Sequence, residues 1–301
     1  MRAIIRLRDF LVYTNIYIGL CAAALSWETF ALLKIPSTHN WYLLLIFGAT
    51  LFVYNLHYFA KLKGPKENSR MQWCRGNKML LLAFVIGSLL FILAVLFYHY
   101  KAIFGGPGNW QYRNLIVLLI IPALALAYSF PIFKKSLRQI GWLKMISLSG
   151  IWAFSTVLLP VFLLPDGSGI APDDHIVLMI FINRFIFIAA LSVVFNLKDL
   201  EEDKQAGIRT LAVIFGQKKV LQWGQWIFPF LFLGSACIFI FSIPDSPKGL
   251  GGGIGAITVA IFRCFRDFRS EKYSEARFVM EYDGLMLVQP LILIFVQLFT
   301  H

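Results

Sequence analysis

The chain has 301 residues, of which 58% are hydrophobic and only 15% are charged. Soluble domains are about half apolar and about a quarter charged, so this composition indicates an integral membrane protein. The formal net charge of +12 is spread between apolar stretches and is not gathered on a soluble domain, which argues against a nucleic-acid partner. The four cysteines lie far apart and predict neither a disulfide framework nor a zinc site.

Nine apolar segments follow one another along the chain, most of them near the ~20 residues that a membrane-spanning helix needs. We therefore predict an all-α integral membrane protein with nine transmembrane helices. The predicted spans are 10–33, 41–60, 79–99, 113–133, 142–165, 175–197, 220–243, 250–265 and 282–300.

The distribution of lysine and arginine predicts the orientation of these spans. Most of the 28 basic residues fall at the N-terminus or in the loops that follow even-numbered spans. Because basic loops stay in the cytoplasm, the N-terminus is expected to be cytoplasmic and the C-terminus outside. Three polar loops, at 53–70, 127–142 and 195–219, are then expected at the cytoplasmic face.

The last of these loops carries a chemically specific pattern. Asn196, Asp199 and Asp203 are spaced three and four residues apart, which places them on one stripe of a helix. Two carboxylates this close repel each other, so a cation between them is favourable, and oxygen ligands of this kind suit magnesium. A solvated helix end with mixed charges suits the same spacing equally well.

A short internal match links this loop to the first one. Residues 53–56 read VYNL and residues 194–197 read VFNL, each at the end of a predicted span. The match indicates a parallel duplication of four-helix units at about 10–133 and 142–265, with a ninth helix after them, inside a single transmembrane domain over 1–301. Chance is the alternative explanation for four matching positions.

Three segments resemble motifs of the UbiA superfamily of intramembrane prenyltransferases. Residues 196–216, NLKDLEEDKQAGIRTLAVIFG, are similar to its second aspartate-rich motif, and residues 128–134, YSFPIFK, resemble its Tyr-Ser-x-Pro-x-x-Lys motif. Asn55 stands where the first aspartate-rich motif begins. That motif continues with two aspartates, and this chain has Phe59 and Lys63 in their places. The chain thus keeps one acidic motif and lacks its partner.

The resemblance implies a fold, a reaction and a set of site residues. In the family, magnesium ions hold the diphosphate of an allylic prenyl donor, the carbon–oxygen bond ionises, and an acceptor captures the cation. Here one magnesium site is expected to be retained, with Asp199, Asp203 and Asn196 as its ligands. The implied catalytic residues are Asp199, Asp203, Lys134 and Tyr128, and the implied diphosphate contacts are Asn55, Lys61, Lys63, Lys134 and Arg209.

Three functions follow as hypotheses. The first is a prenyltransferase in the cytoplasmic membrane, with its active site on the cytoplasmic face, that joins a prenyl chain to an unidentified aromatic or lipid acceptor. The second is a non-catalytic protein that binds prenyl diphosphates or lipids, because the first motif lacks its aspartates and the nearby Lys61 and Lys63 cannot reproduce the coordination of a metal. The third is a transporter built on the parallel repeat, although its spans contain few polar groups at mid-membrane.

Overall fold

The computed structural model describes residues 2–64, 68–105, 112–129, 139–164, 169–242, 250–268 and 274–300, and every regular element among them is a helix. The all-α prediction is thereby confirmed for the described residues. The chain divides into two compact units. The first comprises Met1–Leu126 and Lys272–Leu287, and the second comprises Ala127–Glu271 and Val288–His301.

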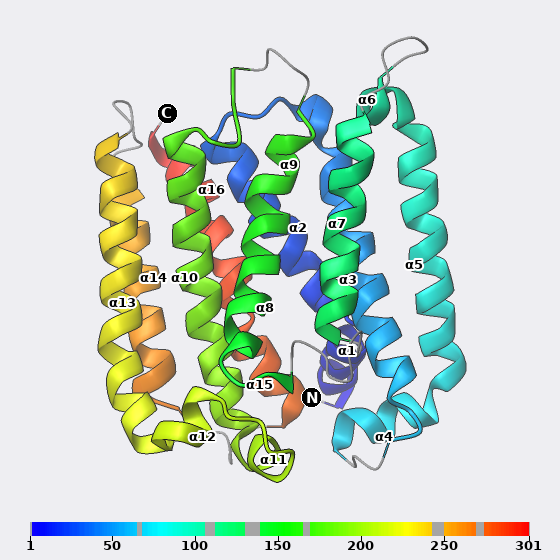
Figure 1. Cartoon of the computed structure of the whole chain (residues 1–301), viewed down its shortest axis with the longest axis vertical. Coiled ribbons are helices and arrows are strands. Elements are labelled where there is room, and N and C mark those ends of the chain that lie inside the picture. Colours follow the sequence, from blue (N-terminus) through cyan, green and yellow to red (C-terminus); the bar gives the residue numbers. More distant parts are fainter. Residues whose placement is uncertain are drawn as a thin grey trace. The chain divides into compact units, whose positions relative to one another are not determined.

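The first unit is organised around one long apolar helix. This helix, α3 (Trp41–Ala60), packs against α2 (Ile16–Leu32) and α5 (Lys78–Tyr98), as Figure 1 shows. Its apolar side chains contact neighbours on both flanks, and Asn55 is a buried polar residue near its end. The other helices are α1 (Arg2–Tyr13), η1 (Ser37–His39), α4 (Ser69–Gly76), α6 (Tyr100–Phe104), α7 (Tyr112–Ser129), which belongs to this unit up to Leu126, and α15 (Glu275–Tyr282).

A left-handed residue bends the chain between α1 and α2. Asn15 has φ 64° and ψ 11°, a conformation that asparagine adopts more readily than most residues because its short polar side chain can bond locally. The two helical segments, Ile4–Tyr13 and Ile16–Leu32, meet at 68°. The bend ends α1 and leaves the Asn15 side chain buried inside the first unit.

The second unit is organised around α10 (His175–Lys198), which packs against α8 (Leu143–Ala153) and α13 (Gln217–Ser242) (Figure 1). Side chains from Phe187 to Val194 are almost fully buried. Small residues in that stretch, Ala189, Ala190 and Ser192, allow neighbouring helices to approach closely. The remaining elements are η3 (Phe154–Leu158), α9 (Leu159–Phe162), α11 (Leu200–Gln205), α12 (Leu211–Phe215), α14 (Leu250–Arg266) and α16 (Leu285–Thr300), whose last part belongs to this unit.

A proline explains the π-helical turn η3 that joins α8 to α9. Pro160 has no backbone N–H, so the carbonyl of Thr156, four residues earlier, loses its α-helical donor. A wider turn accommodates this loss. The Thr156 hydroxyl and the Ser155 hydroxyl each donate to a carbonyl one turn back, at 2.8 and 2.6 Å.

Five of the described helices are long and apolar enough to cross a membrane, and a sixth span results if the bent pair of α1 and α2 is counted as one. The protein is therefore an integral membrane protein. Of the other predicted spans, α14 and α16 have 17 and 16 residues, close to the lower limit of about 17 residues for a helix that crosses a bilayer. The count of nine and the orientation of the termini stay predictions.

Candidate functional site

A lysine from α8 pairs with the acidic motif at the end of α10. The Nζ atom of Lys144 donates to both carboxylate oxygens of Asp203, at 3.0 and 2.8 Å, and lies 3.8 Å from Oδ2 of Asp199. The side chains of Lys144 and Asp203 are each only 6% exposed, and that of Asp199 is 20% exposed. The ammonium group thus occupies the space between two carboxylates.

The junction between α10 and α11 sets the position of these carboxylates. Asp199 ends α10, and its N–H donates to the carbonyl of Phe195 at 2.9 Å. The N–H of Asp203 then donates to the carbonyl of Asp199 at 2.8 Å, so the helical register continues across the junction. The predicted stripe is therefore real for Asp199 and Asp203, and Asn196 lies buried one turn before Asp199.

Two glycines shape the loop that follows. Gly207 has φ 66°, and the N–H of the next residue, Ile208, donates to the carbonyl of Asp203 at 2.8 Å, which ends α11. A Cβ atom on Gly141 would lie only 2.3 Å from the carbonyl oxygen of Arg209. Glycine at 141 therefore lets the loop pass directly over the chain that leads into α8.

No sequence pattern singles out Lys144 as a site residue. It lies 59 positions from Asp203 in the chain, and in the sequence it was one basic residue among several at the start of a predicted span. One signal was present: Lys144 is surrounded by apolar residues on both sides, and a lysine in a membrane segment needs a counter-ion. Thr210 is a second residue with no predicted role. Its hydroxyl is fully buried and has no hydrogen-bond partner among the described residues.

The predicted magnesium site and Lys144 compete for the same atoms. A magnesium ion bound to Asp203 would take the oxygens that now accept from the ammonium group, and two cations this close repel each other. The described part of the chain contains no group of three or more His, Cys, Asp or Glu side chains that could hold a metal. The residues present therefore do not fit a resident magnesium ion while Lys144 stays in place, and the magnesium prediction stays untested.

In the first unit, the amide of Asn55 is held by protein partners. Its Nδ2 atom donates to the carbonyls of Thr14 and Leu51, both at 2.9 Å, and its Oδ1 atom accepts from Nδ2 of Asn15 at 3.0 Å. Asn55 is fully buried. These bonds tie α3 to the bend between α1 and α2.

A buried arginine completes this network. Arg70 donates to Oδ1 of Asn15 at 2.5 Å and to the carbonyl of Val12 at 3.2 Å, and its guanidinium lies 3.8 Å from the ring centre of Tyr58. Tyr58 follows Asn55 by three positions, as Asp199 follows Asn196. Where the second unit has a carboxylate beside a lysine, the first unit has an aromatic ring beside an arginine, an arrangement that stabilises the cation without a metal ligand.

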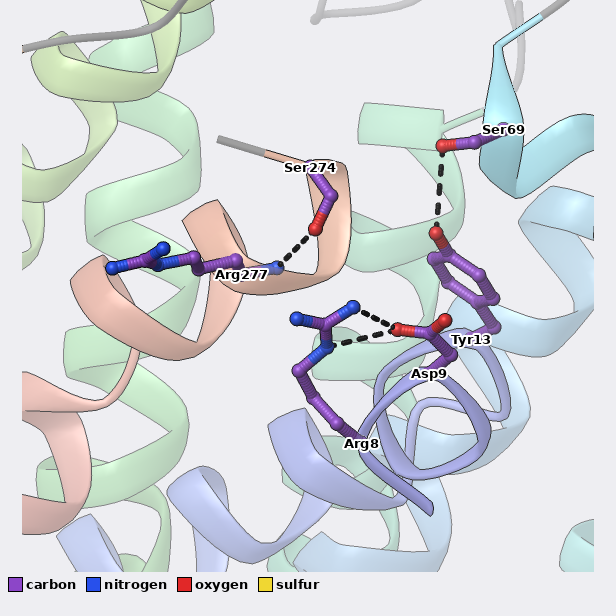
Figure 2. A network of polar contacts seen from close by, with 6 residues as sticks. All are labelled: Arg8, Asp9, Tyr13, Ser69, Ser274 and Arg277. Atoms are coloured by element: carbon purple, nitrogen blue, oxygen red, sulfur yellow. Dashed lines mark hydrogen bonds and ion pairs between the residues drawn. The ribbon is translucent and has the colours of Figure 1, made fainter. Parts of the chain in front are cut away.

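Further polar contacts surround the same end of the first unit (Figure 2). The hydroxyl groups of Tyr13 and Ser69 are 3.4 Å apart, and the guanidinium of Arg8 donates to the carboxylate of Asp9 at 2.6 and 2.9 Å. Ser274 caps α15, because its hydroxyl oxygen accepts from the backbone N–H of Arg277. These contacts join α1 to α4 and fix the start of α15.

The other predicted site residues lie on separate elements. Lys61 and Lys63 are exposed on the turn after α3, which Arg75 fixes by donating to the carbonyls of Leu62 and Gly64 at 3.1 and 2.5 Å. Tyr128 is half-buried near the end of α7, and Arg209 is exposed. Pro131 and Lys134 lie outside the described residues.

The sequence model of the UbiA prenyltransferase family matches residues 73–287. The chain belongs to the UbiA prenyltransferase family. The match includes the acidic motif and Lys144, and it begins after Asn55, so the region with the missing aspartates lies outside it. No curated protein and no solved structure matches the chain. The resemblance found in the motifs is confirmed, and the general expectation for a UbiA protein is prenyl transfer within a membrane.

Proposed function

We propose that this UbiA protein is an enzyme that transfers an isoprenoid chain from a prenyl diphosphate to an aromatic or lipid acceptor. The observation that carries the proposal is the cluster at the end of α10 in which the buried Lys144 and Asp203 meet the partly exposed Asp199. Charged side chains are seldom buried unless they are paired, and a buried charge at the end of a membrane-spanning helix is a candidate for a functional site. The cluster lies within the part of the chain that matches the family.

The proposed reaction breaks the bond between C1 of the prenyl chain and the bridging oxygen of the diphosphate. The electron pair leaves with the diphosphate, and the allylic carbon accepts a pair from the acceptor, which then releases a proton. An ammonium group has three N–H donors, and Asp203 takes two of those of Lys144. We assign the third, which has no hydrogen-bond acceptor among the described residues, to an oxygen of the departing diphosphate.

The two aspartates then act by holding this donor in place. A lysine side chain has several rotatable bonds, and a fixed donor stabilises developing negative charge better than one that must reorganise. Asp203 fixes Nζ through both of its oxygens, and Asp199 lies close enough to add electrostatic attraction. Arg209, on the loop above Gly141, is the proposed second cation for the diphosphate.

The proposed reaction also requires a site that holds little water. Leu197 and Leu200 flank Asp199 in the sequence and are 3% and 8% exposed. An allylic cation reacts with water, so a site with few water molecules favours capture by the intended acceptor. The predicted roles of Asn55, Lys61, Lys63, Lys134 and Tyr128 in diphosphate binding stay predictions, as do the cytoplasmic membrane and the cytoplasmic face.

A turnover assay tests the proposal. The purified protein, in nanodiscs, is incubated with labelled prenyl diphosphates of several chain lengths and with a lipid and quinol extract as the source of acceptors, with and without magnesium. We expect release of diphosphate together with a new labelled lipid. Release of neither compound, under either condition, would contradict the enzyme proposal.

A second function is favoured by two features of the chain. The lysine between the aspartates and the missing acids of the first motif suit a protein that binds a prenyl diphosphate or lipid without reaction. Such a protein should be stabilised by prenyl diphosphate, with a higher melting temperature, while the ligand is recovered unchanged. The same incubation, followed by mass analysis of the ligand, separates the two functions.

A further inference from the structure

We infer that Lys144 is the resident cation of the aspartate site and takes the place of a divalent metal ion there. The inference deepens the proposed function, because it specifies how the same site is charged. The inference concerns metal binding, however, so it can be tested without measuring turnover.

The first step is that the ammonium group of Lys144 contacts both aspartates. Asp203 uses both oxygens to accept from Nζ of Lys144, at 3.0 and 2.8 Å. Asp199 presents Oδ2 to the same atom at 3.8 Å. The positions from which two carboxylates would jointly bind a metal ion are thus already directed at one ammonium group.

The second step is that Lys144 does not reach the site from a flexible surface. Its backbone N–H donates to the carbonyls of Ile140 and Gly141 at 3.1 and 3.2 Å, which fixes the start of α8. Gly141 in turn contacts the carbonyl of Arg209 on the loop that follows α11. The lysine and the aspartates are therefore held by one packed junction, and Lys144 as a whole is 5% exposed.

The third step is electrostatic. Magnesium binds carboxylate oxygens at about 2.1 Å, and Nζ lies 2.8 Å from Oδ2 of Asp203. A metal ion on that oxygen would therefore stand within about 5 Å of the ammonium group, in surroundings where screening by water is weak. Moving the lysine away would instead leave it without the carboxylate that offsets its burial.

The fourth step is the ligand count. The described residues offer no third acidic, histidine or cysteine side chain at this site. Counted by themselves, the two carboxylates carry a charge of −2, and the ammonium group of Lys144 reduces the charge of these three side chains to −1. The lysine thus removes much of the attraction that would draw a free divalent cation to the site.

Titration with manganese alone, followed by electron paramagnetic resonance of free Mn²⁺, tests the inference. The metal-stripped protein is placed in phosphatidylcholine nanodiscs, without any diphosphate. We expect wild-type protein to bind no more Mn²⁺ than Asp203→Asn. Lys144→Met should bind one Mn²⁺ at least ten-fold more tightly than wild type, and the double variant Lys144→Met with Asp203→Asn should lose it again.

Two further variants keep the test decisive. Lys144→Gln is neutral but can still donate to Asp203, and it replaces Lys144→Met if that variant fails to fold. Lys204→Met removes an exposed lysine that pairs with Glu201, and it should gain no Mn²⁺ site.

Two outcomes overturn the inference. One is a Mn²⁺ site in the wild-type protein that Asp203→Asn abolishes, and the other is the absence of any gain in Mn²⁺ binding when Lys144 is neutralised. The inference and the proposed function can fail separately. The Mn²⁺ titration tests the inference alone, and the turnover assay tests the proposed function alone.

Discussion

The Nζ atom of Lys144 lies 2.8 Å from Oδ2 of Asp203, and both side chains are buried. A buried ion pair gains little over an apolar pair of the same shape, but losing one partner leaves the other charge without compensation. This asymmetry makes the pair a sensitive point for both stability and function. It also means that single and double substitutions should behave differently.

Asp203→Asn should lower the free energy of unfolding by about 3 kcal/mol, because the buried Lys144 ammonium would keep only the more distant carboxylate of Asp199, at 3.8 Å, as its counter-charge. Replacing both residues, as Lys144→Met with Asp203→Leu, should recover most of that loss. Denaturation in mixed micelles measures both changes. The matched control is Glu201→Gln, which breaks an exposed ion pair with Lys204 and should cost at most about 0.5 kcal/mol. Equal losses for the buried and the exposed pair would refute this account of the cluster.

Asn55→Asp should destabilise the first unit more than Asn55→Ala. The Nδ2 atom of Asn55 donates to two backbone carbonyls, and aspartate would place a carboxylate oxygen against those carbonyls. We expect a loss of about 2 kcal/mol for alanine and a larger loss for aspartate, measured by thermal denaturation. If aspartate is tolerated as well as alanine, the hydrogen-bond pattern at Asn55 has been assigned wrongly.

Gly141→Ala should displace the loop that carries Arg209. The added methyl group would lie 2.3 Å from the carbonyl oxygen of Arg209, whereas at Gly150, in α8, a Cβ would meet no heavy atom within 4 Å beyond its chain neighbours and the backbone of its own helix. We therefore expect Gly141→Ala to lower the melting temperature clearly and Gly150→Ala to leave it within about 2 °C. Similar melting temperatures for the two alanine variants would show that the loop does not rest on Gly141.

The thiol of Cys74, on α4, should make the free energy of unfolding depend on pH in the alkaline range. Burial raises the pKa of its thiol, the charge of Arg70 lowers the pKa by a smaller amount, and Glu275 raises it slightly. Since the folded-state pKa lies above the unfolded one, the neutral thiol contributes its full stability below about pH 8.5. That contribution is lost as the pH rises through the folded-state pKa. Wild type should therefore lose more stability between pH 8 and pH 10 than Cys74→Ala, as measured by denaturation, and identical losses would contradict the shift.

The two aspartates of the candidate site could be predicted to lie together because they are only four residues apart in the sequence. The spacing of Asp199 and Asp203 depends only on helical periodicity, and the structure keeps the helical register across the junction at Asp199. Lys144 could not be found in this way, because its contact with Asp203 joins α8 to α11 across 59 positions of the chain. No short-range pattern encodes that distance.

The number of spans shows a related limit. Hydropathy records how many apolar residues follow one another, but it does not record whether their helix is continuous. The left-handed Asn15 divides the first apolar segment into two helices that meet at 68°. The burial of Asn55 depends on that bend, since its partners Thr14 and Asn15 lie there.

The most direct test of the account is single-turnover transfer of a labelled prenyl chain by wild type, Asp203→Asn and Glu201→Gln, each confirmed as folded. Glu201→Gln removes a negative charge from the same short helix, α11, at an exposed position. The account predicts a labelled acceptor product with wild type, a transfer rate within about two-fold for Glu201→Gln, and a rate at least about 100-fold lower for Asp203→Asn. Transfer by Asp203→Asn at the wild-type rate, or no transfer by wild type to any acceptor, would contradict it.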